Sequence, residues 1–216
     1  MTVGAVVVPA RIEEALADAS GRIAVRRIVD SAWAGGALPI IVVSVDDADA
    51  GVTSALTGSP ATRVDPRGRS GAAAYRLGAQ AALDAVRETR AVLLWPGRMT
   101  WIDPETVTSL IEAHGRAPDQ VIRPQRAGQA GWPVLVPAGR IEEVLGESGV
   151  VGVDERLAET ASDTLELGDP GSVLGNEVAI DELPDYAGPP EPVGGPPPEW
   201  GAAAAETPEP EVPPGA

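Results

Sequence analysis

Three short apolar runs, each the length of a strand, constrain the fold of this chain most strongly. They are VGAVVVP (3–9), PIIVVSV (39–45) and AVLLWP (91–96). Runs of this kind suit the buried strands of a parallel sheet that helices cover. The segments between them, residues 21–36 and 69–90, have helical patterns. The chain therefore predicts a β-α-β-α-β alternation with right-handed crossovers.

A clear helix start follows the third run. Asp103 is placed to cap the helix, Pro104 suits its first position, and Glu105 lies in its first turn. Gly115 is expected to end this helix.

The rest of the domain predicts a small mixed edge of the sheet. Short strands are expected in VIRP (121–124), in GWPVLVP (131–137), and in DTLELG and NEVAID further on, with a helix in AGRIEEVLGESG (138–149). We therefore expect a three-layer α/β/α domain with a mostly parallel sheet.

The composition changes at residue 187. The last 30 residues contain ten of the 22 prolines, five glutamates and no basic residue. Proline without a period prevents helix and sheet, so we expect a folded domain at 1–186 and a disordered acidic tail at 187–216. Trp200 and the prolines of the tail are available to a protein partner.

The residue inventory excludes several classes of function. A formal net charge of -16 disfavours nucleic acid as a partner. The chain has no lysine and no cysteine, and His114 is its one histidine, which excludes Schiff-base chemistry, thiolate nucleophiles and an all-histidine metal site. Because no apolar run approaches the roughly 20 residues of a membrane span, we expect a cytoplasmic protein without a membrane partner.

In order and spacing, these segments resemble the molybdenum-cofactor nucleotidyltransferases, the MobA-like NTP transferase group. The resemblance covers about residues 3–186 and depends on VGAVVVPA, AVLLWPGRMTWIDPETV, GWPV and VAIDELPDY. It implies a Rossmann-like sheet of the nucleotide-diphospho-sugar transferase type. The implied activity is transfer of a nucleoside monophosphate from an NTP to a phosphorylated small molecule such as molybdopterin, with magnesium.

The chain departs from the family pattern at the phosphate loop and at the metal site. Where the family has a Gly-rich loop with an arginine and a lysine, this chain has RIEEALADAS, a helical pattern whose one base is Arg11. Arg98 stands where the family has a magnesium-binding aspartate, and a cation there repels a metal ion. The second metal-binding aspartate of the family matches Asp181, which is the one candidate metal ligand in this chain. Magnesium is thus expected only if the family activity persists, and we expect that activity to be weak or lost.

The candidate ligand-binding residues are four arginines and one tryptophan. Arg98 would anchor a phosphate of a nucleotide or metabolite, pair with Asp181, or lie on the surface. Arg11, Arg69 and Arg76 are further phosphate donors at the carboxyl ends of the strands, with the surface as their alternative. Trp132, which replaces a family histidine, would stack on a base or pterin or else fill the core.

Other polar residues have plainer expectations. His114 is expected to be a cation that complements the end of its helix, with catalysis as the alternative, and Glu13 and Glu14 are expected to form a solvated helix face. Asp46 and Asp47 would contact a ribose or form a turn.

Three functions remain open at this point: the family activity, a non-catalytic nucleotide-binding, metabolite-binding or regulatory protein-interaction module on the same fold, and a sugar transferase. The last needs an Asp-x-Asp metal motif, and the one in Asp47-Ala48-Asp49 follows the wrong strand. Residues 10–20 discriminate between the first two. A helix packed over the mouth of the site argues against the enzyme, whereas an open loop with free amides supports it.

Overall fold

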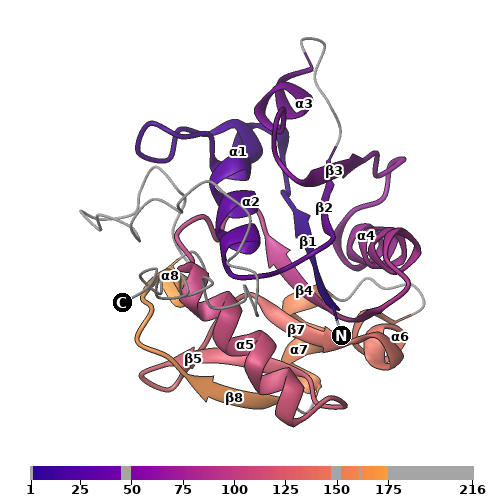
Figure 1. Cartoon of the computed structure of the whole chain (residues 1–216), viewed down its shortest axis with the longest axis vertical. Coiled ribbons are helices and arrows are strands. Elements are labelled where there is room, and N and C mark those ends of the chain that lie inside the picture. Colours follow the sequence, from indigo (N-terminus) through magenta and orange to yellow (C-terminus); the bar gives the residue numbers. More distant parts are fainter. Residues whose placement is uncertain (1, 45–49, 147–151, 161, 175–216) are drawn as a thin grey trace, which may run out of the picture.

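The three apolar runs form the centre of one sheet. The computed structural model describes residues 2–44, 50–146, 152–160 and 162–174, and in these residues eight strands pair in the order β3-β2-β1-β4-β7-β5-β6, with β8 also paired to β5 (Figure 1). The strands are β1 (Thr2–Val8), β2 (Ile40–Val43), β3 (Ala61–Val64), β4 (Thr89–Pro96), β5 (Ile122–Arg126), β6 (Gln129–Ala130), β7 (Val134–Pro137) and β8 (Asp163–Glu166).

Strand direction divides the sheet into two parts. β1 is parallel to both β2 and β4, and β2 is parallel to β3. β7 is antiparallel to β4 and β5, β6 is antiparallel to β5, and β8 is parallel to β5. The expectation of a parallel sheet with a mixed edge is therefore confirmed.

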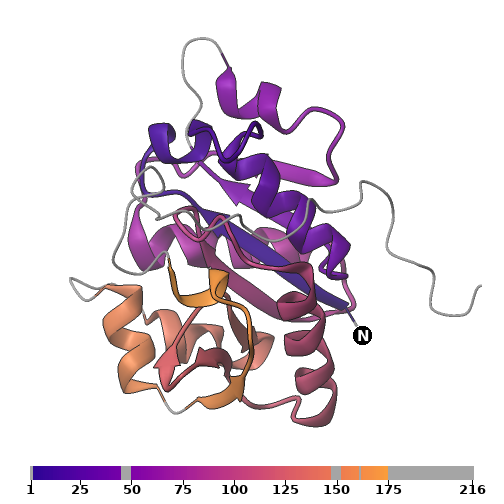
Figure 2. The same ribbon diagram turned by 90° about the vertical axis from the view of Figure 1, so that its left-hand side faces the viewer.

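Helices cover both faces of the sheet. α2 and α5 pack on one face and α4 and α6 on the other, which gives the three layers seen in Figures 1 and 2. The helices are α1 (Ile12–Leu16), α2 (Ala24–Ala34), α3 (Gly51–Ala55), α4 (Gly71–Ala85), α5 (Pro104–Arg116), α6 (Ile141–Leu145), α7 (Val153–Glu159) and α8 (Gly171–Leu174), with a 3-10 turn at Ala138–Arg140. None of these described helices is long and apolar enough to cross a membrane.

The core lies along β1 and β4. Val6 and Leu94 are register partners in these strands, and both are fully buried. The chain has no phenylalanine, and buried tryptophans supply the large aromatic volume instead. Trp95 is completely buried and donates its indole N–H to the Met99 carbonyl at 2.8 Å, which satisfies its polar atom.

The α2 helix differs from its expected pattern. The helical pattern of residues 21–36 predicts Ile23 on the apolar face and the arginines largely on the other face, but Ile23 lies just before the helix and is 38% exposed. Arg27, expected on the polar face, is buried, and its guanidinium lies 4.5 Å from the centre of the Trp101 ring. Stacking on an aromatic face explains why the core accepts this cation.

The start of α5 lies where the sequence predicted it. Asp103 accepts a hydrogen bond from the Glu105 N–H at 2.9 Å, as expected of an N-cap. The helix continues one residue past Gly115 and ends at Arg116.

Several short elements had no sequence prediction. They include α3, β3 and α7, whose residues form no continuous apolar run. The predicted strand in NEVAID, the boundary at 186/187 and the tail with Trp200 lie outside the described residues.

The contact of α4 with the sheet generates a testable prediction. A methyl group at Gly78 would overlap the side chains of Val6 in β1 and Val43 in β2. We predict that Gly78→Ala lowers the free energy of unfolding by about 1–3 kcal/mol through overpacking, although alanine favours an unconstrained helical position by about 1 kcal/mol. Gly139→Ala is the control, because a methyl group there meets nothing within 4 Å. Urea unfolding that found both variants as stable as the wild type would contradict this packing.

Candidate functional site

The site implied by the resemblance lies where β1 and β4 end side by side. The last residues of the two strands, Val8 and Pro96, are register partners, and the Gly97 N–H donates to the Val8 carbonyl at 3.1 Å. A methyl group added at Gly97 would lie 2.7 Å from the Cα of Pro9 and 2.7 Å from Oε1 of Glu14. The two chain segments therefore approach closely here, with the Glu14 carboxylate against them.

Glu14 comes from α1, the short helix that begins four residues after β1 ends. Its carboxylate turns back toward the strand, and Oε2 accepts a hydrogen bond from the Ala10 N–H at 3.1 Å. Because Pro9 has no N–H, Ala10 carries the first backbone donor after β1. That donor is therefore already bonded within the chain.

Packing holds α1 in place. Ala15 is fully buried, and Ile12 and Leu16 pack against the core as partly buried residues. The helix lies against α2 and α3. Glu13 is exposed, as expected of a solvated helix face, but the same expectation was wrong for Glu14, which is partly buried.

Burial and charge act on Glu14 in opposite directions. Burial raises the pKa of its carboxyl group above the ordinary value, and this effect is larger than the lowering by the Ala10 N–H and by the positive charges of Arg98 and Arg11. The two cations thus contribute to the electrostatic environment of the same carboxylate.

Arg98 and Trp132, two of the predicted site residues, lie near each other. The Arg98 guanidinium carbon is 5.8 Å from the centre of the Trp132 ring, and that of Arg123 in β5 is 5.9 Å from it. Both distances are within the range of cation–π attraction. Trp132 is 1% exposed, and its backbone N–H donates to the Ser172 carbonyl at 2.9 Å. A base would reach this ring only if the surrounding side chains moved.

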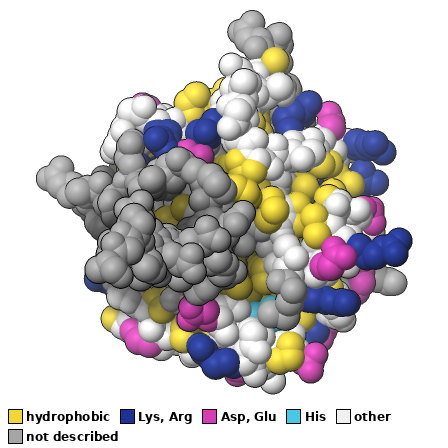
Figure 3. All heavy atoms as spheres, in the orientation of Figure 1, with side chains coloured by type: hydrophobic (Ala, Val, Ile, Leu, Met, Phe, Trp, Pro, Cys, Tyr) yellow, Lys and Arg dark blue, Asp and Glu magenta, His cyan; other side chains and the backbone are white. Residues whose placement is uncertain are grey.

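The other arginine candidates lie in different surroundings. Arg11 is exposed at the start of α1, and Arg69 is exposed in the turn before α4. Arg76 turns toward α6, where it donates to the Leu145 carbonyl at 3.3 Å and lies 3.4 Å from the Glu142 carboxylate. On the face shown in Figure 3, arginine side chains stand beside acidic ones along the edge of the molecule.

The predicted metal ligand and ribose contacts cannot be placed. Asp181, Asp46, Asp47 and Asp49 lie outside the described residues. Among the residues that are described, no group of three or more histidine and acidic side chains is arranged to hold a metal ion.

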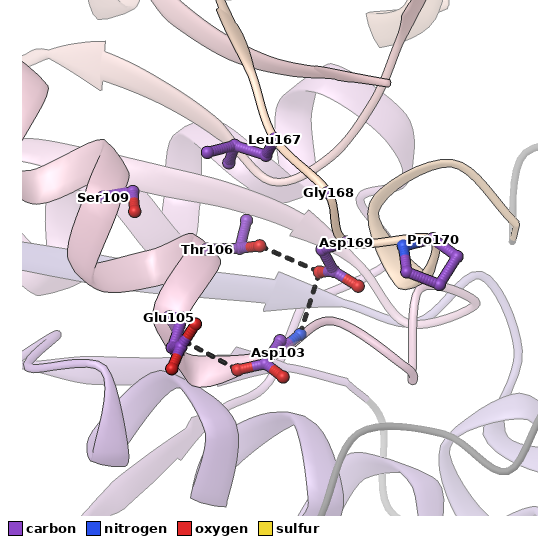
Figure 4. Close-up of a pocket in the computed structure, with 8 residues that line it drawn as sticks. All are labelled: Asp103, Glu105, Thr106, Ser109, Leu167, Gly168, Asp169 and Pro170. Carbon is purple, nitrogen blue, oxygen red and sulfur yellow. Dashed lines mark hydrogen bonds between the residues drawn. The ribbon is translucent and has the colours of Figure 1, made fainter. Parts of the chain in front are cut away.

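A pocket that the sequence did not predict lies at the start of α5 (Figure 4). Its volume is about 310 Å³, and its lining includes Asp103, Glu105 and Asp169. The Asp169 carboxylate accepts hydrogen bonds from the Asp103 N–H at 3.0 Å, the Thr106 hydroxyl at 2.9 Å and the Gly171 N–H at 2.7 Å. Asp169 therefore joins the segment before α8 to α5, and the acidic lining of the pocket disfavours a phosphate.

Burial raises the pKa of Asp169 in spite of these three donors. In the sequence, Asp169 is one acid in an ordinary Asp-Pro-Gly turn, and no local pattern indicates its long-range contacts.

His114 is not the expected helix-end cation. It is 1% exposed, and neither of its ring nitrogens has a hydrogen-bond partner among the residues that the structure describes. Burial lowers its pKa, and the nearby charge of Asp119 opposes this only in part. The fold therefore favours the neutral imidazole.

The lowered pKa of His114 predicts sensitivity to acid. Between its folded pKa and the ordinary value near 6.5, the unfolded chain binds more protons than the folded one. The free energy of unfolding should therefore fall as the pH drops below about 6.5. Urea titrations between pH 5 and 8 should show a smaller slope for His114→Gln, and the same slope in both proteins would contradict this account.

Several solved structures share the fold. A nucleotidyl transferase from Methanothermobacter thermautotrophicus is 19% identical with a TM-score of 0.64, over 86% of this chain and 94% of that one. Rv0371c from Mycobacterium tuberculosis H37Rv, in complex with manganese, is 19% identical with a TM-score of 0.59, over 77% and 89%. The CMP:2-keto-3-deoxy-manno-octonic acid synthetase complexed with CTP is 14% identical with a TM-score of 0.54, over 77% and 90%. The likeness identifies a nucleotidyltransferase-like fold.

The sequence profile of the MobA-like NTP transferase domain matches residues 11–162. The chain therefore belongs to the MobA-like NTP transferase family, which confirms the resemblance drawn from its motifs. No curated protein matches it.

Proposed function

We propose that this chain is a non-catalytic binding module on the nucleotidyltransferase scaffold, in which the family transfer reaction is weak or lost. The observation that carries the proposal is the hydrogen bond from the Ala10 N–H to the Glu14 carboxylate at 3.1 Å. A family enzyme needs the chain after the first strand to offer amides to a triphosphate, and here a helix and its carboxylate take that place.

Charge also argues against transfer. In-line attack at the α-phosphate needs positive groups, usually with a metal ion, around the oxygens that gain negative charge. A carboxylate about 4 Å from a phosphate oxygen costs about 4 kcal/mol at an effective dielectric constant near 20. Arg98, at the position of a family metal ligand, supplies a positive charge but cannot coordinate magnesium.

Arg98 and Arg11 are the proposed contacts for an anionic ligand. Guanidinium groups bind phosphate without a metal ion, so the ligand class is a nucleotide or a phosphorylated metabolite. The CTP complex of one neighbour in the same fold class supports this choice. Molybdopterin is the acceptor implied by the family, and Trp132, Arg69, Arg76 and Asp181 remain proposals as ligand or metal contacts.

The remaining sequence-based proposals concern the whole chain. They are a domain at 1–186, a tail at 187–216 that binds a protein partner, and a cytoplasmic location. Removal of residues 187–216 should leave ligand binding unchanged but abolish capture of a specific protein. This result would support a ligand-binding domain and a separate partner-binding tail.

Turnover is the direct test of the proposed function. With ATP, GTP, CTP or UTP, magnesium and molybdopterin as the phosphorylated acceptor, the wild-type protein should release pyrophosphate no faster than the protein-free control. Rapid magnesium-dependent release by the wild type would contradict the proposal.

Calorimetry tests the binding part. Heat of binding for millimolar CTP should be similar with and without magnesium, because arginine and not metal holds the phosphate. Arg98→Gln should weaken binding about tenfold, the loss of one charge-assisted contact of about 1.4 kcal/mol. Arg116→Gln is the matched control, because Arg116 is exposed at the end of α5. Equal binding by both variants would contradict the role of Arg98.

A further inference from the structure

The Glu14 carboxylate occupies surroundings that suit an external anion. It accepts the Ala10 N–H at 3.1 Å and lies within the influence of the positive charges of Arg98 and Arg11. Backbone N–H donors and the positive charge of guanidinium groups also attract a phosphate oxygen. A carboxylate oxygen and a phosphate oxygen therefore compete for the same partners.

We propose that Glu14 is a specificity-determining residue that acts as the chain's own anion at the end of β1 and lowers its affinity for phosphate groups there. The inference rests on the proposed function, because it concerns the same ligand site. Glu14 is the residue that determines how strongly that site selects against phosphate groups.

The position of Glu14 makes the competition effective. Ala15 is buried, and Ile12 and Leu16 pack on the core, so the backbone that carries the carboxylate is fixed. Gly97 has no side chain, which leaves room for the carboxylate beside Pro9. An incoming phosphate must displace an anion that is held nearby by covalent connection and needs no diffusion to return.

The neighbouring Glu13 supplies a matched control. It lies in the same helix and carries the same charge, but it is exposed and no hydrogen bond holds it to the Ala10 N–H. Glu13→Gln and Glu14→Gln therefore change the net charge of the chain equally. Any difference between them comes from position.

The test measures binding of inorganic pyrophosphate to the full chain by calorimetry without metal. Glu14→Gln should bind pyrophosphate at least about tenfold more tightly than the wild type, and Glu13→Gln should bind it as the wild type does. Affinities of the two variants within twofold of each other would overturn the inference.

A second substitution tests where the gained affinity lies. In the Glu14→Gln background, Arg98→Gln should remove most of the gain, whereas a gain that persisted would place the anion elsewhere and overturn the inference. If circular dichroism shows that Glu14→Gln does not fold, Glu14→Asp takes its place. Aspartate keeps the charge but is one methylene shorter. Glu14→Asp should therefore bind pyrophosphate between twofold and tenfold more tightly than the wild type. No gain in affinity would overturn the inference.

The outcomes separate this inference from the proposed function. Turnover of an NTP by the wild type would refute the non-catalytic role. The pyrophosphate affinities of Glu14→Gln and Glu13→Gln would still test the role of Glu14. Equal pyrophosphate binding by the variants would refute the role of Glu14 without affecting the turnover result.

Discussion

The close approach of the chain segments that follow β1 and β4 decides which groups lie at this edge of the sheet. Parallel pairing of the two strands brings Pro9 and Gly97 together at one edge of the sheet, with Glu14 against both. In an open α/β sheet, this edge is where ligands bind. Here a side chain of the protein itself bonds the first available amide, so the chemistry of the edge differs from that of a phosphate-binding loop.

Two partly buried carboxylates show how differently similar groups can be used. Asp169 accepts three hydrogen bonds and links the segment before α8 to the start of α5, which is a structural role. Glu14 accepts the Ala10 N–H, the backbone of Arg11 also acts on its carboxylate, and the charges of Arg98 and Arg11 lie in its electrostatic surroundings. In both cases burial outweighs the donors and raises the pKa.

The sequence predicted the central sheet because β1, β2 and β4 are continuous apolar runs. It also predicted the start of α5, where Asp103 and Pro104 have local roles. It missed β3, an edge strand that is only partly buried, because such a strand needs no apolar run.

Predictions for polar residues failed where tertiary burial decides their state. Neither the burial of His114 nor that of Arg27 follows from the helical pattern around it. Helical pattern did indicate that residues after β1 form a helix, but it gave no reason to separate Glu14 from Glu13. Their difference depends on Ala10 and Gly97, which α1 meets only in the folded chain.

The Ala10 amide reports most directly on this account. Its proton and nitrogen chemical shifts, followed by NMR as the pH is lowered from 7, should titrate together with the Glu14 carboxyl group, with a midpoint above the ordinary glutamate pKa of about 4.3. In Glu14→Gln the same resonance should not follow that titration. An Ala10 resonance that stays constant in the wild type, or that titrates equally in both proteins, would contradict the claim that Glu14 occupies the anion position at the end of β1.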